Sequence, residues 1–275
     1  MGISDRSRLD GLFKQALFEG ISEEELSGVT MHGKCKLITD LVGALRGKVP
    51  QRVHGNAKVA RSSLVTIVDT FEPSENFMTY QMQKRERFFN EISQDRYAGL
   101  RDRIMGWGDL ETEVRQDTLI EASSLHQYSY LSGVADRIPI NWVFHDESIP
   151  SRRHGVISVG GFSGDLTSEY GRIRQDISAR AHFEDALTSF NTGHHETTHA
   201  IQFTFANAFH HNRINATHKL YDDARMFHAI EVNKAVIPCS VLKHSDQSAY
   251  QHQVHEVLAD AEGSAISEAL LDLSQ

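Results

Sequence analysis

The feature that most limits how this chain folds is the run His194-His195-Glu196-Thr197-Thr198-His199. Positions i and i+4 of an α-helix lie on one face, so His195 and His199 would present their imidazoles side by side. This H-E-x-x-H arrangement suits a zinc ion, which accepts two imidazole nitrogens at about 2.0–2.1 Å. Glu196 would lie about 100° around the helix from His195, beside the ion, where its carboxylate can take a proton from a water that the metal activates.

A catalytic zinc keeps three protein ligands and one open position, so a third ligand is required. The continuation H-E-x-x-H-x-x-G-x-x-H is absent, because Gln202 and Phe205 replace its glycine and third histidine. The best candidate is Glu256, 57 residues after His199. Residues 247–273 contain no proline and carry an apolar stripe at helical spacing, so they predict a second helix. Its apolar stripe consists of Val254, Leu258, Ala261 and Ala265.

Asp260 follows Glu256 by one helical turn and would share its face. We expect Asp260 to accept the distal N–H of a ligating histidine, His195 by preference, because such contacts fix the tautomer and ring orientation of a ligand. Gly263, a further turn on, has no side chain and would let this helix approach the motif helix closely. The alternative is that Glu256 and Asp260 form a solvated stripe.

Other acidic residues and histidines fit the third position less well. Glu231 has Ala235 at i+4, where a partner would be needed, and the remaining candidates are expected to point elsewhere or to be satisfied locally. Asp222 and Asp223 are typical of a helix N-terminus, where acidic side chains offset the helix dipole. The remaining candidates are Glu262, Glu268, His210 and His211.

An H-E-x-x-H motif followed by an E-x-x-x-D helix resembles the gluzincin branch of the zincin metallopeptidases. The resemblance implies zinc bound by His195, His199 and Glu256, with Glu196 as general base and Asp260 orienting a ligating histidine. It also implies an edge strand that binds peptide substrate, a role for which the segment Val156–Gly161 is the candidate. The residue that would stabilise the oxyanion stays open among Tyr221, His228 and Tyr250.

The expected fold class is α+β, with a helical N-terminal region at 1–60 and a zincin-like domain at 61–275 that contains a small mixed sheet, the H-E-x-x-H helix and a C-terminal helix. Short amphipathic helices are expected over 5–47, a loop over 48–61, one or two long helices over 78–132 and a helix from Ala181 to Phe190. Ser63–Phe71 is rich in β-branched residues and predicts a buried strand. Ile138–Phe144 and Val156–Val159 predict a hairpin with a long loop, and Gly160, Gly161 and Gly164 would end the sheet.

Composition excludes several classes of protein. The 28 Lys and Arg against 37 Asp and Glu give a net charge of −9, which argues against nucleic-acid binding. There is no apolar run long enough to span a bilayer and no export signal in the first twenty residues. We therefore expect a cytoplasmic protein, or one exported by a route without a signal peptide. Cys35 and Cys239 are expected to be reduced.

The sequence predicts a zinc-dependent peptidase, an endopeptidase rather than an exopeptidase, whose partner is a protein or peptide substrate. Two other classes stay open: a metal-binding protein that is not a peptidase, and a helical interaction protein with an incidental H-E-x-x-H. The sequence does not indicate the oligomeric state.

Overall fold

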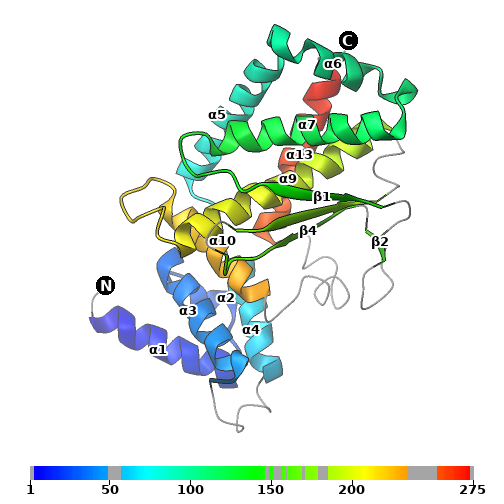
Figure 1. The fold of residues 1–275 in the computed structure, drawn as a ribbon. Helices are drawn as coiled ribbons and strands as arrows, with labels where there is room; N and C mark the ends of the chain where they lie inside the picture. The colour runs from blue at the N-terminus through cyan, green and yellow to red at the C-terminus, as the bar shows by residue number, and fades with distance from the viewer. Residues whose placement is uncertain are drawn as a thin grey trace.

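The computed structural model describes residues 3–48, 57–145, 149–150, 157–158, 160–168, 171–178, 185–234 and 253–272. The chain is mostly helical, with one three-stranded mixed sheet and a C-terminal helix (Figure 1). Within these residues, no helix is both long and apolar enough to cross a bilayer.

Short helices form the N-terminal end of the molecule, as predicted (Figure 1). Ser22 begins the second of them with a capping box, in which its side chain and that of Glu25 each bond the other residue's backbone N–H. Cys35 is buried and makes no disulfide, and burial raises the pKa of its thiol to about 12; Cys239 lies outside the described residues. These elements are α1 (Ile3–Phe18), α2 (Glu23–Leu26), α3 (Met31–Gly43) and the π-helix η1 (Ala44–Lys48).

The strand predicted at Ser63–Phe71 is wrong, because these residues belong mainly to helix α4 (Ala57–Asp69). The side chains buried in α4 recur at helical spacing, at 60, 63, 64, 67 and 68. The Ser63 hydroxyl donates to the carbonyl of Ala16 in α1 at 2.8 Å, which joins α4 to α1. The end of the loop expected over 48–61 is also helical. The division between 1–60 and 61–275 stays a prediction, and it falls inside α4.

Two long helices occupy the predicted range 78–132 and pack against each other. Three short elements connect them, with Trp107 buried among them. The elements in order are α5 (Glu75–Ile92), η3 (Asp95–Tyr97), α6 (Ala98–Met105), η4 (Trp107–Asp109) and α7 (Thr112–Leu131).

The sheet differs from the predicted hairpin. Strand β1 (Ile140–Phe144) pairs in parallel with β5 (Ile173–Ile177), and β4 (Gly160–Gly164) pairs antiparallel with the other side of β5. The order β1-β5-β4 makes a mixed sheet, as expected, with β5 in the centre. Strand β5 was not predicted, because its sequence IRQDI has only two apolar residues, Ile173 and Ile177. Both are buried, on the same face of the strand as Gln175. The glycines expected to end the sheet instead form β4, whereas β2 (Ile149–Pro150) and β3 (Ile157–Ser158) pair separately.

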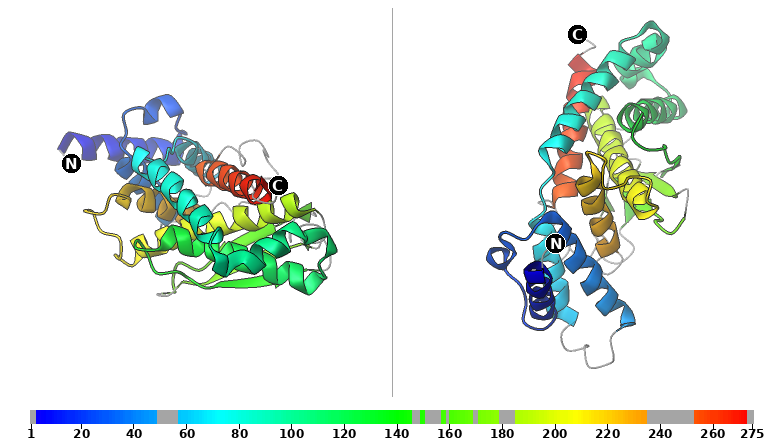
Figure 2. Two further views of the ribbon diagram at one scale, coloured as in Figure 1. Left: turned by 90° about the horizontal axis from the view of Figure 1, so that it is seen from above. Right: turned by 90° about the vertical axis from the view of Figure 1, so that its left-hand side faces the viewer.

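Helix α9 (Ala186–His210) carries the H-E-x-x-H motif and lies between the sheet and helix α13 (Val254–Asp272) (Figure 2). Asp185 caps it by accepting from the Thr188 backbone N–H at 2.9 Å. The predicted helix over 181–190 is thus confirmed from Ala186, and residues 181–184 lie outside the described ones. The later residues predicted to be buried, Ile201, Phe205 and Ala208, are buried.

Sheet and helix α9 approach closely. The Gln175 side chain of β5 donates to the Gly193 carbonyl at 3.2 Å, and the Phe203 ring lies over Gly164 of β4. On another side, α10 (Tyr221–Lys234) packs against α9 and begins with Asp222 and Asp223, as predicted.

Helices α9 and α13 meet at Gly263, as the sequence predicted. A Cβ atom there would lie 2.9 Å from the Asn191 carbonyl oxygen and 3.1 Å from the His195 backbone nitrogen. Both are backbone atoms, so they cannot rotate away. Glycine at this position therefore sets how closely the two motif-bearing helices approach.

Replacing Gly263 with alanine is expected to destabilise the fold by about 1–3 kcal/mol, because the methyl group forces α13 away from α9. Urea unfolding of the metal-free protein measures this. Gly11→Ala in α1 is the control, since a Cβ at Gly11 meets nothing within 4 Å; it should leave stability unchanged or raise it slightly. Equal stability of the two variants would contradict the prediction.

A part-buried ion pair joins α5 to α13, with Arg85 one third exposed and Glu262 buried. Arg85 donates to both carboxylate oxygens of Glu262, at 2.9 and 2.6 Å. The Tyr130 hydroxyl of α7 donates to the same carboxylate, and the Tyr80 hydroxyl donates to the Tyr130 carbonyl. Glu262 is therefore fully engaged away from the motif histidines, as predicted. Removing one partner of such a pair would leave a buried charge, so the network fixes where α13 lies.

Two histidines, His126 of α7 and His194 of α9, are fully buried beside the Phe88 ring. Their Nδ1 atoms lie 3.2 Å apart, so one ring donates to the other. Burial lowers the pKa of His126 well below 6.5. Each imidazole is consequently neutral in the folded chain.

This burial predicts acid sensitivity. In the unfolded chain His126 binds a proton below its ordinary pKa of about 6.5, whereas in the fold it does not, so stability falls as the pH drops through that value, by up to about 1.4 kcal/mol per unit. His126→Phe should flatten this dependence between pH 6 and 5. Urea unfolding of both proteins in chelator measures the slopes, and parallel slopes would contradict the prediction.

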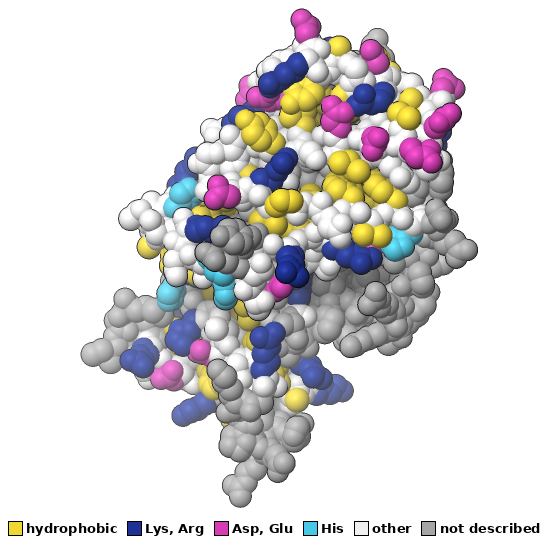
Figure 3. All heavy atoms as spheres, in the orientation of Figure 1, with side chains coloured by type: hydrophobic (Ala, Val, Ile, Leu, Met, Phe, Trp, Pro, Cys, Tyr) yellow, Lys and Arg dark blue, Asp and Glu magenta, His cyan; other side chains and the backbone are white. Residues whose placement is uncertain are grey.

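Charged side chains are interspersed with hydrophobic ones on the face drawn in Figure 3, without one continuous basic patch among its described residues. Acidic side chains are frequent at the end of the molecule where α6 and the start of α7 lie. Exposed acidic residues there are Asp109, Glu111, Glu113 and Asp117.

Candidate metal centre

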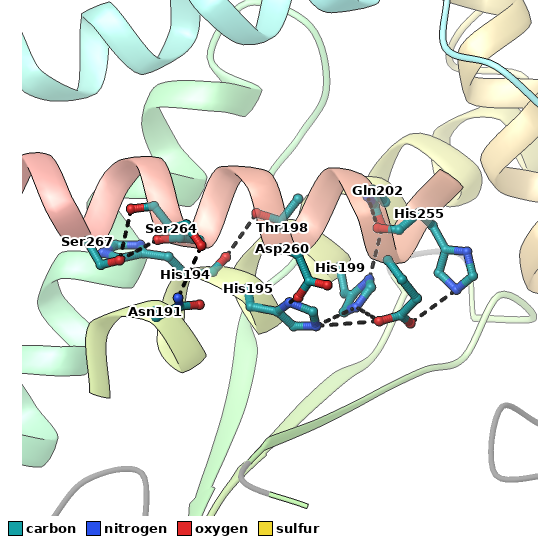
Figure 4. A network of polar contacts seen from close by, with 12 residues as sticks. Asn191, His194, His195, Thr198, His199, Gln202, His255, Asp260, Ser264 and Ser267 are labelled. Carbon is teal, nitrogen blue, oxygen red and sulfur yellow. Dashed lines mark hydrogen bonds and ion pairs between the residues drawn. The ribbon is translucent and has the colours of Figure 1, made fainter. Parts of the chain in front are cut away.

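Three predicted ligands, His195 and His199 of α9 and Glu256 of α13, come together in the structure (Figure 4). The two Nε2 atoms are 3.1 Å apart. The Glu256 Oε2 atom lies 3.6 Å from Nε2 of His195 and 3.4 Å from Nε2 of His199. Two helices that are far apart in sequence thus direct three ligand atoms at one point.

This donor set fits zinc. Ligands at about 2.0–2.1 Å in a tetrahedron have neighbouring donor atoms about 3.3–3.4 Å apart, and the three observed separations lie within a few tenths of an ångström of that. Two imidazoles and one carboxylate are also a set that catalytic zinc sites use. His199 and Glu256 are buried, whereas the His195 side chain keeps 18% of its exposure, so the centre opens to solvent on the His195 side.

Asp260 takes the predicted position. Its Oδ1 lies 2.8 Å from Nδ1 of His195, and its own side chain is exposed. In the neutral ring that a metal requires, Nδ1–H donates to this carboxylate and Nε2 keeps its lone pair, directed at Glu256 and His199. Asp260 therefore selects the tautomer of His195 that is able to bind a metal.

Two residues that sequence reasoning missed complete the surroundings. The Gln202 Oε1 atom lies 3.0 Å from Nδ1 of His199, and its amide Nε2 donates to the His255 carbonyl at 3.0 Å. The His255 Nε2 atom lies 3.3 Å from Oε1 of Glu256. A sequence signal existed for Gln202, since residues at i and i+3 of a helix are neighbours.

Neighbouring charges shift the pKa values of His195 and Glu256 strongly. Burial opposes a charge on His195, but contacts with Asp260, Glu256 and Glu196 outweigh it and raise the pKa of His195 to about 10. Burial likewise opposes the charge of Glu256, but His199, His195 and His255 outweigh it and hold its pKa well below 4.5. Glu256 is therefore an anion at neutral pH, which is the state that a cation requires.

Glu196 is buried on α9, in the turn between the two ligand histidines, at 6% exposure. It acts electrostatically on His195. Its position along the helix is the one that the motif predicts for a group beside the metal.

The alternative candidates for the third ligand lie outside the cluster of His195, His199 and Glu256. Glu231 pairs with Lys234 at 2.7 Å, and His210 contacts His228, its Nδ1 lying 3.0 Å from Nε2. His211 contacts the Ser168 carbonyl at 3.2 Å. Neither His210 nor His211 belongs to the cluster of His195, His199 and Glu256.

The three residues considered for the oxyanion stay unassigned. Tyr221 packs against Phe209 and Arg225, and the His228 ring stacks on His210. Tyr250 lies outside the described residues.

Of the segment Val156–Gly161, the described residues divide between two pairings, with Ile157–Ser158 in β3 and Gly160 onward in β4. Among the described strands, β4 is one of the two edges of its sheet, and β5 lies between it and α9 in the chain.

No protein-family model, curated protein or solved structure matches this chain. The arrangement of side chains in the centre is therefore the basis for a functional interpretation.

Proposed function

We propose that the chain is a zinc-dependent peptidase with His195, His199 and Glu256 as metal ligands and Glu196 as general base. The observation that carries the proposal is the convergence of the three ligand atoms, each within 3.6 Å of the other two, with Asp260 holding the outer nitrogen of His195. The packing of a small mixed sheet and of helix α13 on the motif helix supports the proposal.

Zinc, when bound, supplies a Lewis acid that lowers the pKa of a coordinated water to about 7. Glu196 then accepts the proton of the attacking water and returns it to the leaving amine. Asp260 keeps its hydrogen bond to His195 throughout, so that this ring does not turn away. The aqueous side at His195 gives substrate access to the centre.

The edge strand β4 offers a way to hold the substrate. An extended peptide could pair with the side of β4 that no described strand occupies, adding a strand to the sheet. Recognition by backbone hydrogen bonds along a strand requires chain on both sides of the cleaved bond, which favours an endopeptidase. Proteins or peptides are therefore the proposed substrates.

The proposal is tested by metal analysis together with peptide cleavage. About one zinc per chain is expected in the purified protein, and His195→Ala/His199→Ala should lose it. Cleavage of unstructured protein substrates should stop on chelation and return with zinc. A protein that contains no zinc and takes up none contradicts the metal centre; one that binds zinc but cleaves no peptide would be a metal protein of another kind.

A further inference from the structure

Four residues around the centre form a closed ring of contacts (Figure 4). His199 Nδ1 lies 3.0 Å from Gln202 Oε1, and Gln202 Nε2 donates to the His255 carbonyl at 3.0 Å. The His255 ring lies 3.3 Å from Glu256 Oε1, and Glu256 Oε2 returns to His199 Nε2 at 3.4 Å. The ring crosses twice between α9 and α13, once through Gln202 and once through the ligands.

The orientation of the Gln202 amide is determined by its partners. A backbone carbonyl only accepts, so the NH₂ group of Gln202 must face His255. The amide oxygen then faces Nδ1 of His199, which must carry the proton in order to donate. This leaves the lone pair of His199 on Nε2, directed toward Glu256 and His195. Gln202 thus does for His199 what Asp260 does for His195.

His255 has a comparable relation to Glu256. Its ring is buried, at 1% exposure, and neither ring nitrogen makes a hydrogen bond of good geometry with a described residue, although Nε2 lies 3.3 Å from Oε1 of Glu256. A neutral imidazole carries one N–H, on either Nδ1 or Nε2. With that proton on Nε2, the ring faces Glu256 Oε1 with its donor at 3.3 Å, a polar contact that does not meet hydrogen-bond geometry in the metal-free chain. Oε2 is then the oxygen left for a metal.

We infer that Gln202 and His255 are positioning residues of the metal centre: Gln202 fixes the tautomer of His199, and His255 holds one oxygen of Glu256 so that the other faces the histidines. This inference rests on the proposed zinc site. Neither residue is exposed enough to touch substrate, since Gln202 has 4% and His255 1% of its surface accessible. Their effect is therefore on the ligands alone.

Zinc affinity of single variants, measured by competition with a chromophoric chelator, tests the inference. Gln202→Met and His255→Phe keep approximate side-chain volume but remove the polar contacts, and each should weaken zinc binding about 10–100-fold. His255→Gln retains an N–H donor near the place of Nε2 and should restore most of the affinity. In cobalt-substituted protein, the visible d–d absorption bands should shift in His255→Phe and return toward wild type in His255→Gln.

Two buried residues outside the ring provide matched controls. The Gln127 amide also donates to a backbone carbonyl, that of Ile138, at 3.0 Å, and His126 is an equally buried imidazole. Gln127→Met and His126→Phe should change urea stability without changing zinc affinity or the cobalt spectrum. A general loss of packing would affect all four variants alike.

The outcomes separate this inference from the proposed function. If the wild-type protein binds no zinc, the proposed centre itself is wrong. If the wild type binds zinc and Gln202→Met and His255→Phe bind it equally tightly, the centre stands and the positioning role is wrong. Equal losses of affinity in the ring variants and in the controls would also overturn it.

Discussion

Glu196→Gln is expected to reduce peptide cleavage by about 10²–10⁴-fold, the range that general-base catalysis contributes. Glutamine is nearly isosteric with glutamate but cannot accept the proton of the attacking water. Because Glu196 lies beside the ligands rather than among them, zinc content should stay at about one per chain. Initial rates on an unstructured protein substrate, with metal content measured on the same samples, test the prediction.

Glu231→Gln is the matched control for this experiment, since Glu231 pairs with Lys234 on α10 and is not part of the centre. It should retain wild-type rates. Wild-type activity in Glu196→Gln would rule out Glu196 as the base, whereas loss of zinc in the same variant would mean that Glu196 is a ligand.

Glu256→Ala is expected to weaken zinc binding by more than about 100-fold, because it removes a ligand, and loss of an outer-shell partner alone costs about 10–100-fold. The remaining ligands, His195 and His199, are neutral when they bind a metal, so the cation would also lose the buried anion that neutralises it. Asp260→Asn should have the smaller effect, within the outer-shell range.

Zinc affinity measured by chelator competition gives the order of the two variants. Glu268→Ala on the same helix is the control and should bind zinc like the wild type. If Asp260→Asn weakened binding more than Glu256→Ala, the assignment of ligand and orienting residue would have to be exchanged.

The sequence predicted that His195, His199 and Glu256 come together, because its constraints are local. Spacing along one helix brings His195 and His199 together, and spacing along another puts Asp260 one turn from Glu256. The packing of α9 against α13 is a long-range contact. Gly263 was the sequence signal for it, because a glycine allows two helices to approach closely. The ring through Gln202 and His255 was not predictable in the same way, because its contacts depend on the rotation of each helix about its axis.

The two errors in the predicted fold, at α4 and at the hairpin, arise because tertiary contacts override local sequence preferences. Val65, Thr66, Ile67 and Val68 have high strand propensity, yet packing of α4 against α1 and α3 overrides it. The predicted hairpin failed because β1 pairs with β5, and β5 has a weak apolar pattern with charged Arg174 and Asp176 on one face. Strand partners are decided by the tertiary structure, which propensity does not encode.

The order of the ligands along the chain has a consequence for protein synthesis. The two histidines leave the ribosome well before Glu256, which lies on α13, the last element that the structure describes. A nascent polypeptide that stops before α13 carries two of the three side chains of the candidate centre, His195 and His199. The complete set of three can therefore assemble only after translation has passed α13.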